Sequence, residues 1–236
     1  MLSLAGVDVF IQSSQILRGV SLEVGEREVV CLVGRNGSGK TTTLRTVMGY
    51  LRPRSGAVEF RGRPIHGRRT HEIAALGLGW APEDSAIFSD LTVAENIEIA
   101  TWTRPHGRPA AERVALAYEV FPALRRYAAR RGPEMSGGER KMLSIARALA
   151  LDPEMLLLDE PFEGLSPAII PAVSAGIAAI TNLGRAILIA ESNIHHVPEY
   201  TTRLYVVERG EIIFGGRPDD AWRDPRVSRI IGGRSR

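Results

Sequence analysis

The stretch Gly34-Arg35-Asn36-Gly37-Ser38-Gly39-Lys40-Thr41 matches the pattern G-x-x-x-x-G-K-[ST] in full. It follows residues 29–33, a continuous apolar run that predicts a strand buried on both faces. It precedes residues 40–50, which predict a helix with an apolar face. An accidental glycine turn is the alternative interpretation. A buried strand, a glycine-rich loop and a helix in this order favour a loop that binds phosphate.

The residue types of this phosphate loop (residues 34–41) suit that chemistry. Glycines let backbone N–H groups approach phosphate oxygens with no Cβ in the way. A helix that begins at Lys40 directs its positive end at the same anion, and the Lys40 ammonium is a cationic donor to the β- and γ-phosphates. The Thr41 hydroxyl is a predicted Mg²⁺ ligand. The predicted nucleotide-binding residues of this region are Gly34, Arg35, Asn36, Gly37, Ser38, Gly39, Lys40, Thr41 and Thr42.

A second apolar run, residues 155–158, ends in two carboxylates, Asp159 and Glu160. Open α/β sheets bind their ligands at the carboxyl ends of strands. Asp159 is therefore predicted to hold Mg²⁺, directly or through water. Glu160 is predicted to be catalytic, because a carboxylate here polarises the water that attacks the γ-phosphate. The alternative is an ordinary strand-ending turn, which a complete phosphate loop in the same chain disfavours.

Ser136-Gly137-Gly138-Glu139 precedes a predicted helix over residues 139–151. The spacing of Ser136 and Glu139 is that of a capping box, so the segment predicts a well-formed helix start. A serine hydroxyl, two glycines and a helix N-terminus also make an anion site, and the two interpretations are compatible. Two phosphate-binding surfaces in one chain suggest that they face different nucleotides.

The order of the other predicted elements indicates the fold class. The predicted strands are residues 2–9, 20–24, 57–60, 78–82, 185–190, 204–207 and 212–214. Helices are predicted from Val93, behind the capping-box pair Thr92 and Glu95, over residues 110–128, and over residues 167–182 with Ser166 as cap. Residues 104–109 predict a loop. We therefore expect an α/β chain with a helical insertion over about residues 84–150.

Length and composition limit the number of domains, the cellular compartment and the possible partners of the protein. The chain has 236 residues, 44% of them hydrophobic, which fits one large domain with or without an inserted subdomain. The single cysteine, Cys31, lies in an apolar run and is predicted to be a buried thiol in a reducing cytoplasm. No apolar run is long enough to span a bilayer, and no signal peptide is recognisable. A net charge of +3, scattered arginines and few aromatic residues argue against a nucleic-acid groove.

The phosphate loop, Met135-Ser136-Gly137-Gly138-Glu139 and Asp159-Glu160-Pro161, in this order and spacing, resemble the motifs of ABC-type ATPases over nearly the whole chain. The resemblance implies one domain: an α/β P-loop ATPase core of residues 1–83 and 151–236, with an N-terminal antiparallel β-subdomain and an inserted helical subdomain of residues 84–150. It implies hydrolysis of ATP with Mg²⁺ by two subunits paired head to tail, as a homodimer or a heterodimer. Each ATP then contacts the phosphate loop of one subunit and Ser136, Gly137 and Gly138 of the other, with residues 164–167 crossing the interface.

Finer features resemble the smaller of the two ATPase subunits of branched-chain amino acid importers. They are Ala81-Pro82-Glu83, Arg52-Pro53-Arg54-Ser55-Gly56 and residues 136–143, 158–161 and 164–167. This resemblance implies uptake of branched-chain or other amino acids, two separate permease subunits, a separate periplasmic binding protein, and no nucleic-acid partner. The chain is then peripheral at the cytoplasmic face of the inner membrane. The alternatives are a urea or short-amide importer, export of a lipid-linked cargo, and a soluble ABC ATPase outside transport.

Two positions depart from the wider pattern. Glu83 stands where most ABC ATPases carry a glutamine that reaches Mg²⁺ and the attacking water; a carboxylate also ligates Mg²⁺, so Glu83 is a predicted metal ligand, with a solvated loop residue as the alternative. Ser192 stands where the wider family has a histidine that contacts the γ-phosphate. Serine is short and uncharged, so slow hydrolysis or a mainly regulatory subunit is an open alternative. His195 and His196 are predicted to be surface residues one turn along a following helix.

The adenine contact is the least specific prediction. The resemblance implies an aromatic residue from the first strands that stacks on adenine, and Phe10 is the only aromatic residue nearby. Ile11 fits the position by spacing about as well. Phe10 is therefore predicted to contact adenine, with a place in the core as the alternative.

Overall fold

The computed structural model describes residues 1–104 and 108–231. The chain forms two compact units: unit 1 is Met1–Ile73 with Ala186–Arg236, and unit 2 is Ala74–Arg185. The boundary between unit 1 and unit 2 falls within helix α2 (Thr70–Ala75). The predicted boundaries of the helical subdomain, residues 84 and 150, stay a prediction. Within the predicted loop 104–109, residues 105–107 lie outside the described residues.

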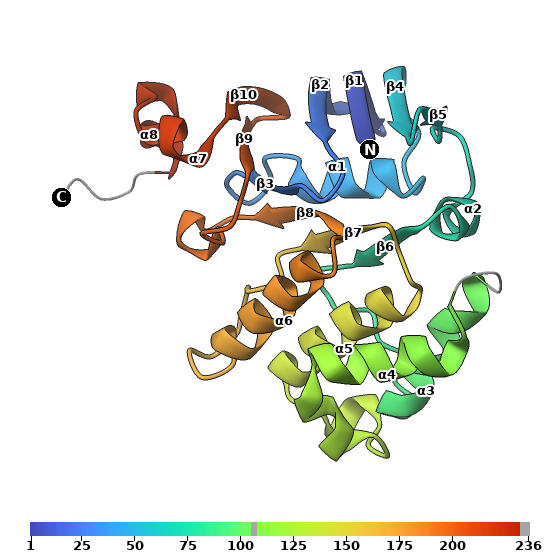
Figure 1. Ribbon diagram of the computed structural model, residues 1–236. Helices are drawn as coiled ribbons and strands as arrows, with labels where there is room; N and C mark the ends of the chain where they lie inside the picture. The colour runs from blue at the N-terminus through green and yellow to red at the C-terminus, as the bar shows by residue number, and fades with distance from the viewer. Residues whose placement is uncertain (105–107, 232–236) are drawn as a thin grey trace. The chain divides into compact units, whose positions relative to one another are not determined.

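Unit 1 begins with an antiparallel sheet in the strand order β2-β1-β4-β5 (Figure 1). Its strands are β1 (Leu2–Ile11), β2 (Ser14–Val24), β4 (Ser55–Phe60) and β5 (Arg63–Pro64). Leu2, Leu4, Val7 and Val9 of β1 are buried, which is the alternation of a sheet with one face on the core, with a shift of register between Leu4 and Val7. The predicted antiparallel β-subdomain is confirmed, and its first two strands are longer than predicted because they form a continuous hairpin.

The second layer of unit 1 has the strand order β10-β9-β3-β8. Its members are β3 (Val29–Val33), β8 (Ala186–Glu191), β9 (Arg203–Glu208) and β10 (Glu211–Gly216). Strand β3 pairs in parallel with β8 and β9, so Cys31 lies between Ile189 and Leu204. Every residue of β3 is buried, as its continuous apolar sequence predicts. Burial raises the pKa of the Cys31 thiol to about 12, which confirms a buried, inert cysteine.

Unit 2 contains the parallel pair β6 (Leu78–Ala81) and β7 (Met155–Asp159), together with helices. The longer helices are α3 (Val93–Ala100), α4 (Ala110–Val120), α5 (Gly137–Ala150) and α6 (Ile170–Asn182); short 3₁₀ helices cover Thr101–Thr103, Pro122–Tyr127 and Gly132–Glu134. Helix α5 packs against α3, α4 and β6 (Figure 1). The α/β fold class predicted from the sequence is confirmed.

Helix ends show where local chemistry decides the boundary. Helix α1 (Lys40–Val47) ends before Gly49, whose φ of 77° starts a reverse turn in which Tyr50 N–H donates to the Arg45 carbonyl at 2.9 Å. The predicted helix over residues 110–128 is wrong beyond Val120. Pro122 disfavours a helical conformation at Phe121, where φ is −125° and ψ is 74°.

The predicted helix over residues 167–182 also starts too early. Helix α6 begins at Ile170, and its N-cap is Ile169 rather than Ser166. Pro171 lacks the N–H that would continue the hydrogen-bond ladder from the preceding turn. Helices α7 (Pro218–Ala221) and α8 (Pro225–Ile231) complete the described chain. Among the described residues, no helix has the length and apolar character needed to cross a membrane.

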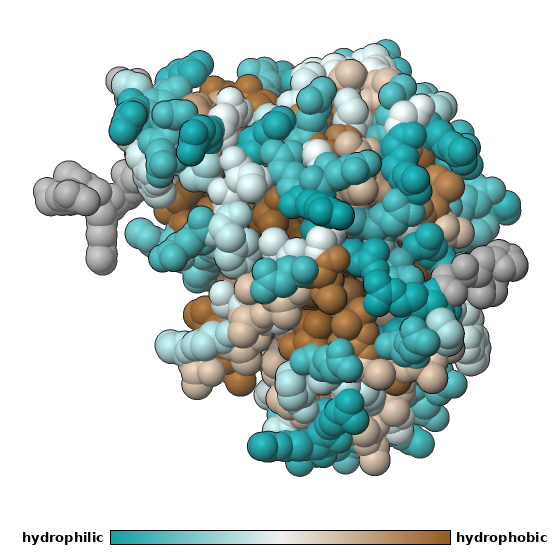
Figure 2. All heavy atoms as spheres, in the orientation of Figure 1, coloured by the Kyte–Doolittle hydropathy of each residue, from teal (hydrophilic) through white to brown (hydrophobic). Residues whose placement is uncertain are grey.

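The surface in view carries hydrophilic side chains over most of its area, with hydrophobic ones gathered partly over the helices of unit 2 (Figure 2). Phe88 and Trp102, both in unit 2, are among the large hydrophobic residues that are exposed. Phe88 belongs to the loop of residues 82–92, which joins β6 to α3 and carries Glu83 (the Glu83 loop).

The C-terminal end of the Glu83 loop is held by Asn96, a fully buried residue of α3. Its Oδ1 accepts the Phe88 N–H at 2.9 Å, and its Nδ2 donates to the carbonyls of Phe88 at 3.0 Å and Thr92 at 2.9 Å. Thr92 in turn caps α3 in the predicted capping box with Glu95, which is confirmed. One buried amide therefore provides the acceptor for the Phe88 N–H and adds a second donor to carbonyls that already accept a backbone N–H.

Replacing Asn96 with Leu is expected to lower the free energy of unfolding by about 3 kcal/mol, because the hydrogen bonds of its buried amide to the backbone of Phe88 and Thr92 are lost together. Urea-induced unfolding monitored by circular dichroism measures the loss. The control is Glu98→Ala on the exposed face of the same helix, which is expected to change stability by less than about 0.5 kcal/mol. Equal stability of Asn96→Leu and the native chain would contradict the role assigned to this side chain.

Candidate nucleotide site

The phosphate loop follows β3 in unit 1 and begins at the tightly packed Gly34. The Gly34 N–H donates to the Glu191 carbonyl at 3.2 Å. A Cβ at Gly34 would lie 2.3 Å from the Val207 carbonyl oxygen and 2.5 Å from Ser38 Oγ, so only glycine fits there. Gly39, with φ at 111°, occupies the left-handed region immediately before α1. The glycines of the motif are thus required by close packing and by backbone conformation.

Lys40 is buried at the first position of α1. Its Nζ donates to the Gly34 carbonyl at 2.7 Å and to the Arg35 carbonyl at 3.2 Å, which holds the ammonium against the loop. Ser38 Oγ is buried and has no hydrogen-bond partner among the described residues. A helix N-terminus, an ammonium and a hydroxyl that needs a partner together fit a phosphate group. Thr41 and Thr42 follow on the first turn of α1 and are half-buried.

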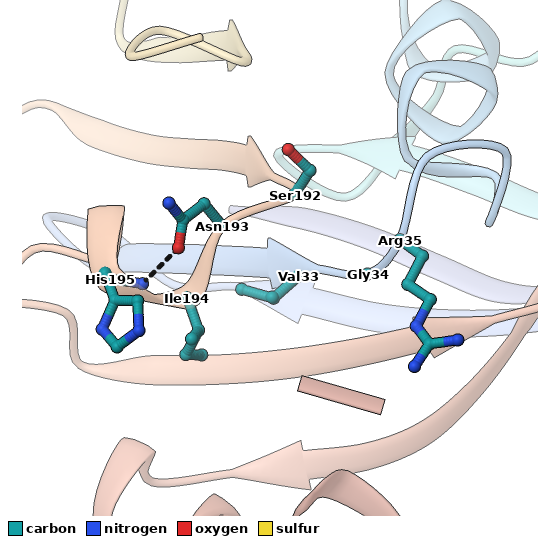
Figure 3. A pocket seen from close by; sticks show the side chains of 7 residues that line it. All are labelled: Val33, Gly34, Arg35, Ser192, Asn193, Ile194 and His195. Atoms are coloured by element: carbon teal, nitrogen blue, oxygen red, sulfur yellow. Dashed lines mark hydrogen bonds between the residues drawn. The ribbon is translucent and has the colours of Figure 1, made fainter. Parts of the chain in front are cut away.

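Ser192 lies beside the phosphate loop, in the loop after β8. A pocket of about 170 Å³ is lined by Val33, Gly34, Arg35, Ser192, Asn193, Ile194 and His195 (Figure 3). The side chains of Ser192 and Arg35 point in opposite directions in this view. The structure therefore brings the predicted residues Gly34, Arg35 and Ser192 to one pocket.

The two histidines of this loop differ from each other. Residues Ile194–His196 form a short 3₁₀ helix, and His195 is exposed, as predicted. His196 is not a plain surface residue, because its Nδ1 lies 3.5 Å from Oε2 of the fully buried Glu191. Sequence reasoning missed this pair. The available signal was a carboxylate at the end of an apolar strand, which needs a polar or charged neighbour when buried.

The acidic strand end belongs to unit 2. Asp159, the last residue of β7, and Glu160 are both buried, a costly location for carboxylates unless polar groups or a cation accompany them. Glu160 has φ at 48°, a left-handed conformation that strains a non-glycine residue by about 1–2 kcal/mol. Strained backbone of this kind is concentrated at functional sites. Thr41, Glu83 and Asp159 offer only oxygen atoms, the donor type that Mg²⁺ prefers.

The segment of Ser136, Gly137 and Gly138 (the Ser-Gly-Gly segment) starts α5. The Glu139 N–H donates to Ser136 Oγ at 3.3 Å and the Ser136 N–H donates to Glu139 Oε2 at 2.7 Å, so the predicted capping box is confirmed. Burial opposes ionisation of Glu139, but its hydrogen bonds with Ser136 outweigh burial and hold the carboxyl pKa below its usual range. Ser136 and Gly137 are exposed at the helix N-terminus.

Glu83 and Phe10 have surroundings that the sequence does not reveal. Glu83 is exposed, and its carbonyl accepts a hydrogen bond from Lys141 Nζ at 2.7 Å. The Arg54 guanidinium lies over the Phe10 ring, 4.9 Å from its centroid. Ile11 is 44% exposed. The adenine contact of Phe10 stays a prediction, and one ring face already has a cationic neighbour.

The chain belongs to the ABC transporter family, because the model of that family matches residues 17–163, more than half of its length. It is therefore an ATP-binding and ATP-hydrolysing subunit of an ABC transporter. This confirms the predicted family and the predicted ATPase activity, and the site residues stay predictions.

Curated relatives cover nearly the whole chain. The lipopolysaccharide export system ATP-binding protein LptB of Acidithiobacillus ferridurans is 34% identical over 92% of this chain and 90% of its own length. The high-affinity branched-chain amino acid transport ATP-binding protein BraG of Pseudomonas aeruginosa is 35% identical over 96% of this chain and 97% of its own length. A crystal structure of an ABC transporter ATP-binding cassette in its ADP conformation is 27% identical, with a TM-score of 0.82 over 99% of both chains.

Gly138→Ala is expected to lower the free energy of unfolding by about 1–3 kcal/mol through overpacking, because the new Cβ would lie 2.7 Å from Ile169 Cγ2. Thermal unfolding measures the loss, and Ile169→Ala in the same chain is expected to relieve the clash. Gly137→Ala is the matched control, since its nearest atom is Arg140 Nη2 at 3.9 Å. Similar unfolding midpoints for both alanine variants would show that Gly138 is not sterically required.

Proposed function

We propose that this chain is the ATPase subunit of an importer of branched-chain or other amino acids. The observation that carries the proposal is the 35% identity to BraG over 96% of this chain and 97% of that protein. The sequence adds support, because Ala81-Pro82-Glu83 and residues 136–143 resemble the smaller ATPase subunit of such importers.

In the proposed reaction the phosphate loop binds the β- and γ-phosphates of ATP through backbone N–H groups and the Lys40 ammonium. Thr41, Asp159 and Glu83 are the proposed ligands of Mg²⁺, whose chemistry when bound is neutralisation of phosphate charge. The Glu160 carboxylate polarises the attacking water and takes its proton. Ser192 donates a hydrogen bond to the terminal phosphate, in place of the histidine of the wider family.

The proposed assembly contains a second ATPase subunit, identical or related. The exposed Ser136 and Gly137, with Gly138, bind the nucleotide held by that partner. Two permease subunits and a separate periplasmic binding protein complete the importer, with this chain peripheral at the cytoplasmic face of the inner membrane. ATP closes the ATPase pair, and hydrolysis with product release reopens it.

Lipopolysaccharide export is a second candidate function. It is favoured by the similarity to LptB, whose 34% identity over 92% of this chain is close to that of BraG. Urea or short-amide import and a role outside transport are the further alternatives. The two leading candidates share the ATPase chemistry and differ in direction and cargo.

Glu160→Gln is expected to bind ATP with unchanged affinity and to hydrolyse it about 10²- to 10⁴-fold more slowly, because an amide cannot accept the proton of the attacking water. Phosphate release by the assembled transporter and binding of a fluorescent ATP analogue measure the two quantities. Glu119→Gln, an exposed carboxylate of α4, is the control. Unchanged turnover in Glu160→Gln would instead mean that this site binds ATP mainly for regulation.

Deleting the gene in the source organism is expected to reduce uptake of radiolabelled leucine while surface lipopolysaccharide stays constant. The wild-type gene restores uptake, and the Glu160→Gln variant does not, since uptake needs hydrolysis at this site. Normal leucine uptake combined with depleted surface lipopolysaccharide would overturn import in favour of export. Normal leucine uptake together with normal surface lipopolysaccharide would overturn both candidate functions in favour of another cargo.

A further inference from the structure

The start of the Glu83 loop is held in a conformation that its own residues disfavour. Ser85 and Ala86 have φ values of 63° and 41°. These values lie in the left-handed region, which is energetically unfavourable for residues that carry a Cβ. Such backbone persists only when surrounding groups impose it. Within the loop, the Ser85 N–H donates to the Pro82 carbonyl at 3.0 Å, and further groups that hold its beginning come from a helix of unit 2, as Asn96 does for its end.

Helix α5 supplies two of these groups. Lys141 is 5% exposed, and its Nζ donates to the Glu83 carbonyl at 2.7 Å. Six residues later, Arg147 donates from Nη2 to the Ser85 carbonyl at 3.4 Å, and its guanidinium lies over the Phe88 ring, 5.1 Å from the centroid. Burial lowers the pKa of Arg147, and Asp84 opposes this. Two cations of one helix thus bind the backbone on both sides of Asp84.

The position of Lys141 in α5 connects its hydrogen bond with the Glu83 carbonyl to the Ser-Gly-Gly segment. Lys141 follows Gly138 by three residues, so both lie within the first turns of the same helix. Hydrogen bonds between successive turns make an α-helix rigid, so a displacement of its N-terminus also moves the next turns. A shift of the Ser-Gly-Gly segment therefore moves the ammonium that holds the Glu83 carbonyl.

We infer that Lys141 is a positioning residue for Glu83, which couples the Ser-Gly-Gly segment to the proposed metal ligand. The inference rests on the proposed function, in which Glu83 holds Mg²⁺. Lys141 acts through the backbone of Glu83 and touches neither nucleotide nor metal. A charge-assisted hydrogen bond to the Glu83 carbonyl fixes the loop more firmly than a neutral one.

Lys141→Met tests the inference, because methionine fills similar space and removes the donor. In the assembled transporter, kcat is expected to fall about tenfold, and the Mg²⁺ concentration for half-maximal turnover to rise about tenfold, as for loss of an outer-shell partner. The apparent KM for ATP at saturating Mg²⁺ is expected to stay constant, since the phosphate loop is unchanged. Lys141→Arg keeps a charged donor and is expected to restore most of the rate. Arg126→Met, which removes an exposed cation of unit 2, is the control.

A double-mutant cycle with Glu83→Ala, which removes the side-chain oxygen atoms, separates positioning from general stability. If Lys141 acts through Glu83, adding Lys141→Met to Glu83→Ala lowers kcat by much less than tenfold. Thermal unfolding midpoints are recorded for every variant. If Lys141→Met does not fold, Lys141→Gln, with a shorter neutral donor, replaces it in the cycle.

The outcomes distinguish the inference from the proposed function. A slow Glu83→Ala beside a Lys141 variant with native kcat and native Mg²⁺ dependence overturns the inference and leaves the proposed function standing. Losses that multiply in the double variant also overturn it, because Lys141 then acts independently of the Glu83 side chain. A Glu83→Ala variant with native turnover removes the metal role of Glu83 and the inference together. Absence of ATP turnover in the wild-type assembly would refute the proposed function itself.

Discussion

Close contact between the phosphate loop and its own framework is the constraint on which the site depends. Gly34 has Val207 and Ser38 so near that no side chain fits, and the Lys40 ammonium is tied to the carbonyls of the two residues that open the loop. The strands β3, β8 and β9 hold this turn because their parallel pairing fixes where β3 ends. Any change in that register would move the cation relative to the backbone N–H groups that share its anion.

In unit 2, too, neighbouring elements hold the backbone in conformations that its own residues disfavour. Glu160, Ser85 and Ala86 all have positive φ values, and each lies in or beside a predicted functional segment. The buried strand β7 leads into Glu160, while α3 and α5 hold the Glu83 loop from its two ends. Rigid elements thus set the conformation of short segments that carry carboxylates, which is the arrangement expected where geometry must be preorganised.

Features governed by neighbouring residues were predictable from the sequence. The phosphate loop between strand and helix, the capping boxes at Thr92 and Ser136, and the fully buried β3 follow from local patterns. Errors at the end of α4 and the start of α6 also have local causes, since Pro122 and Pro171 interrupt patterns that hydrophobic periodicity would continue. Contacts between distant residues were not predictable, because no periodicity relates Lys141 to Glu83 or Arg54 to Phe10.

The buried thiol has a practical consequence for spectroscopy. Cys31 is the only cysteine of the chain, it lies inside β3, and its pKa of about 12 keeps it protonated at neutral pH. The thiolate is the nucleophile that attacks maleimides and thiol-reactive spin labels, so the buried, protonated thiol of the native chain offers these reagents no reactive target. A cysteine introduced on the surface would therefore take up a fluorophore or spin label alone, and distances between labelled subunits during the transport cycle become measurable without removing a native residue.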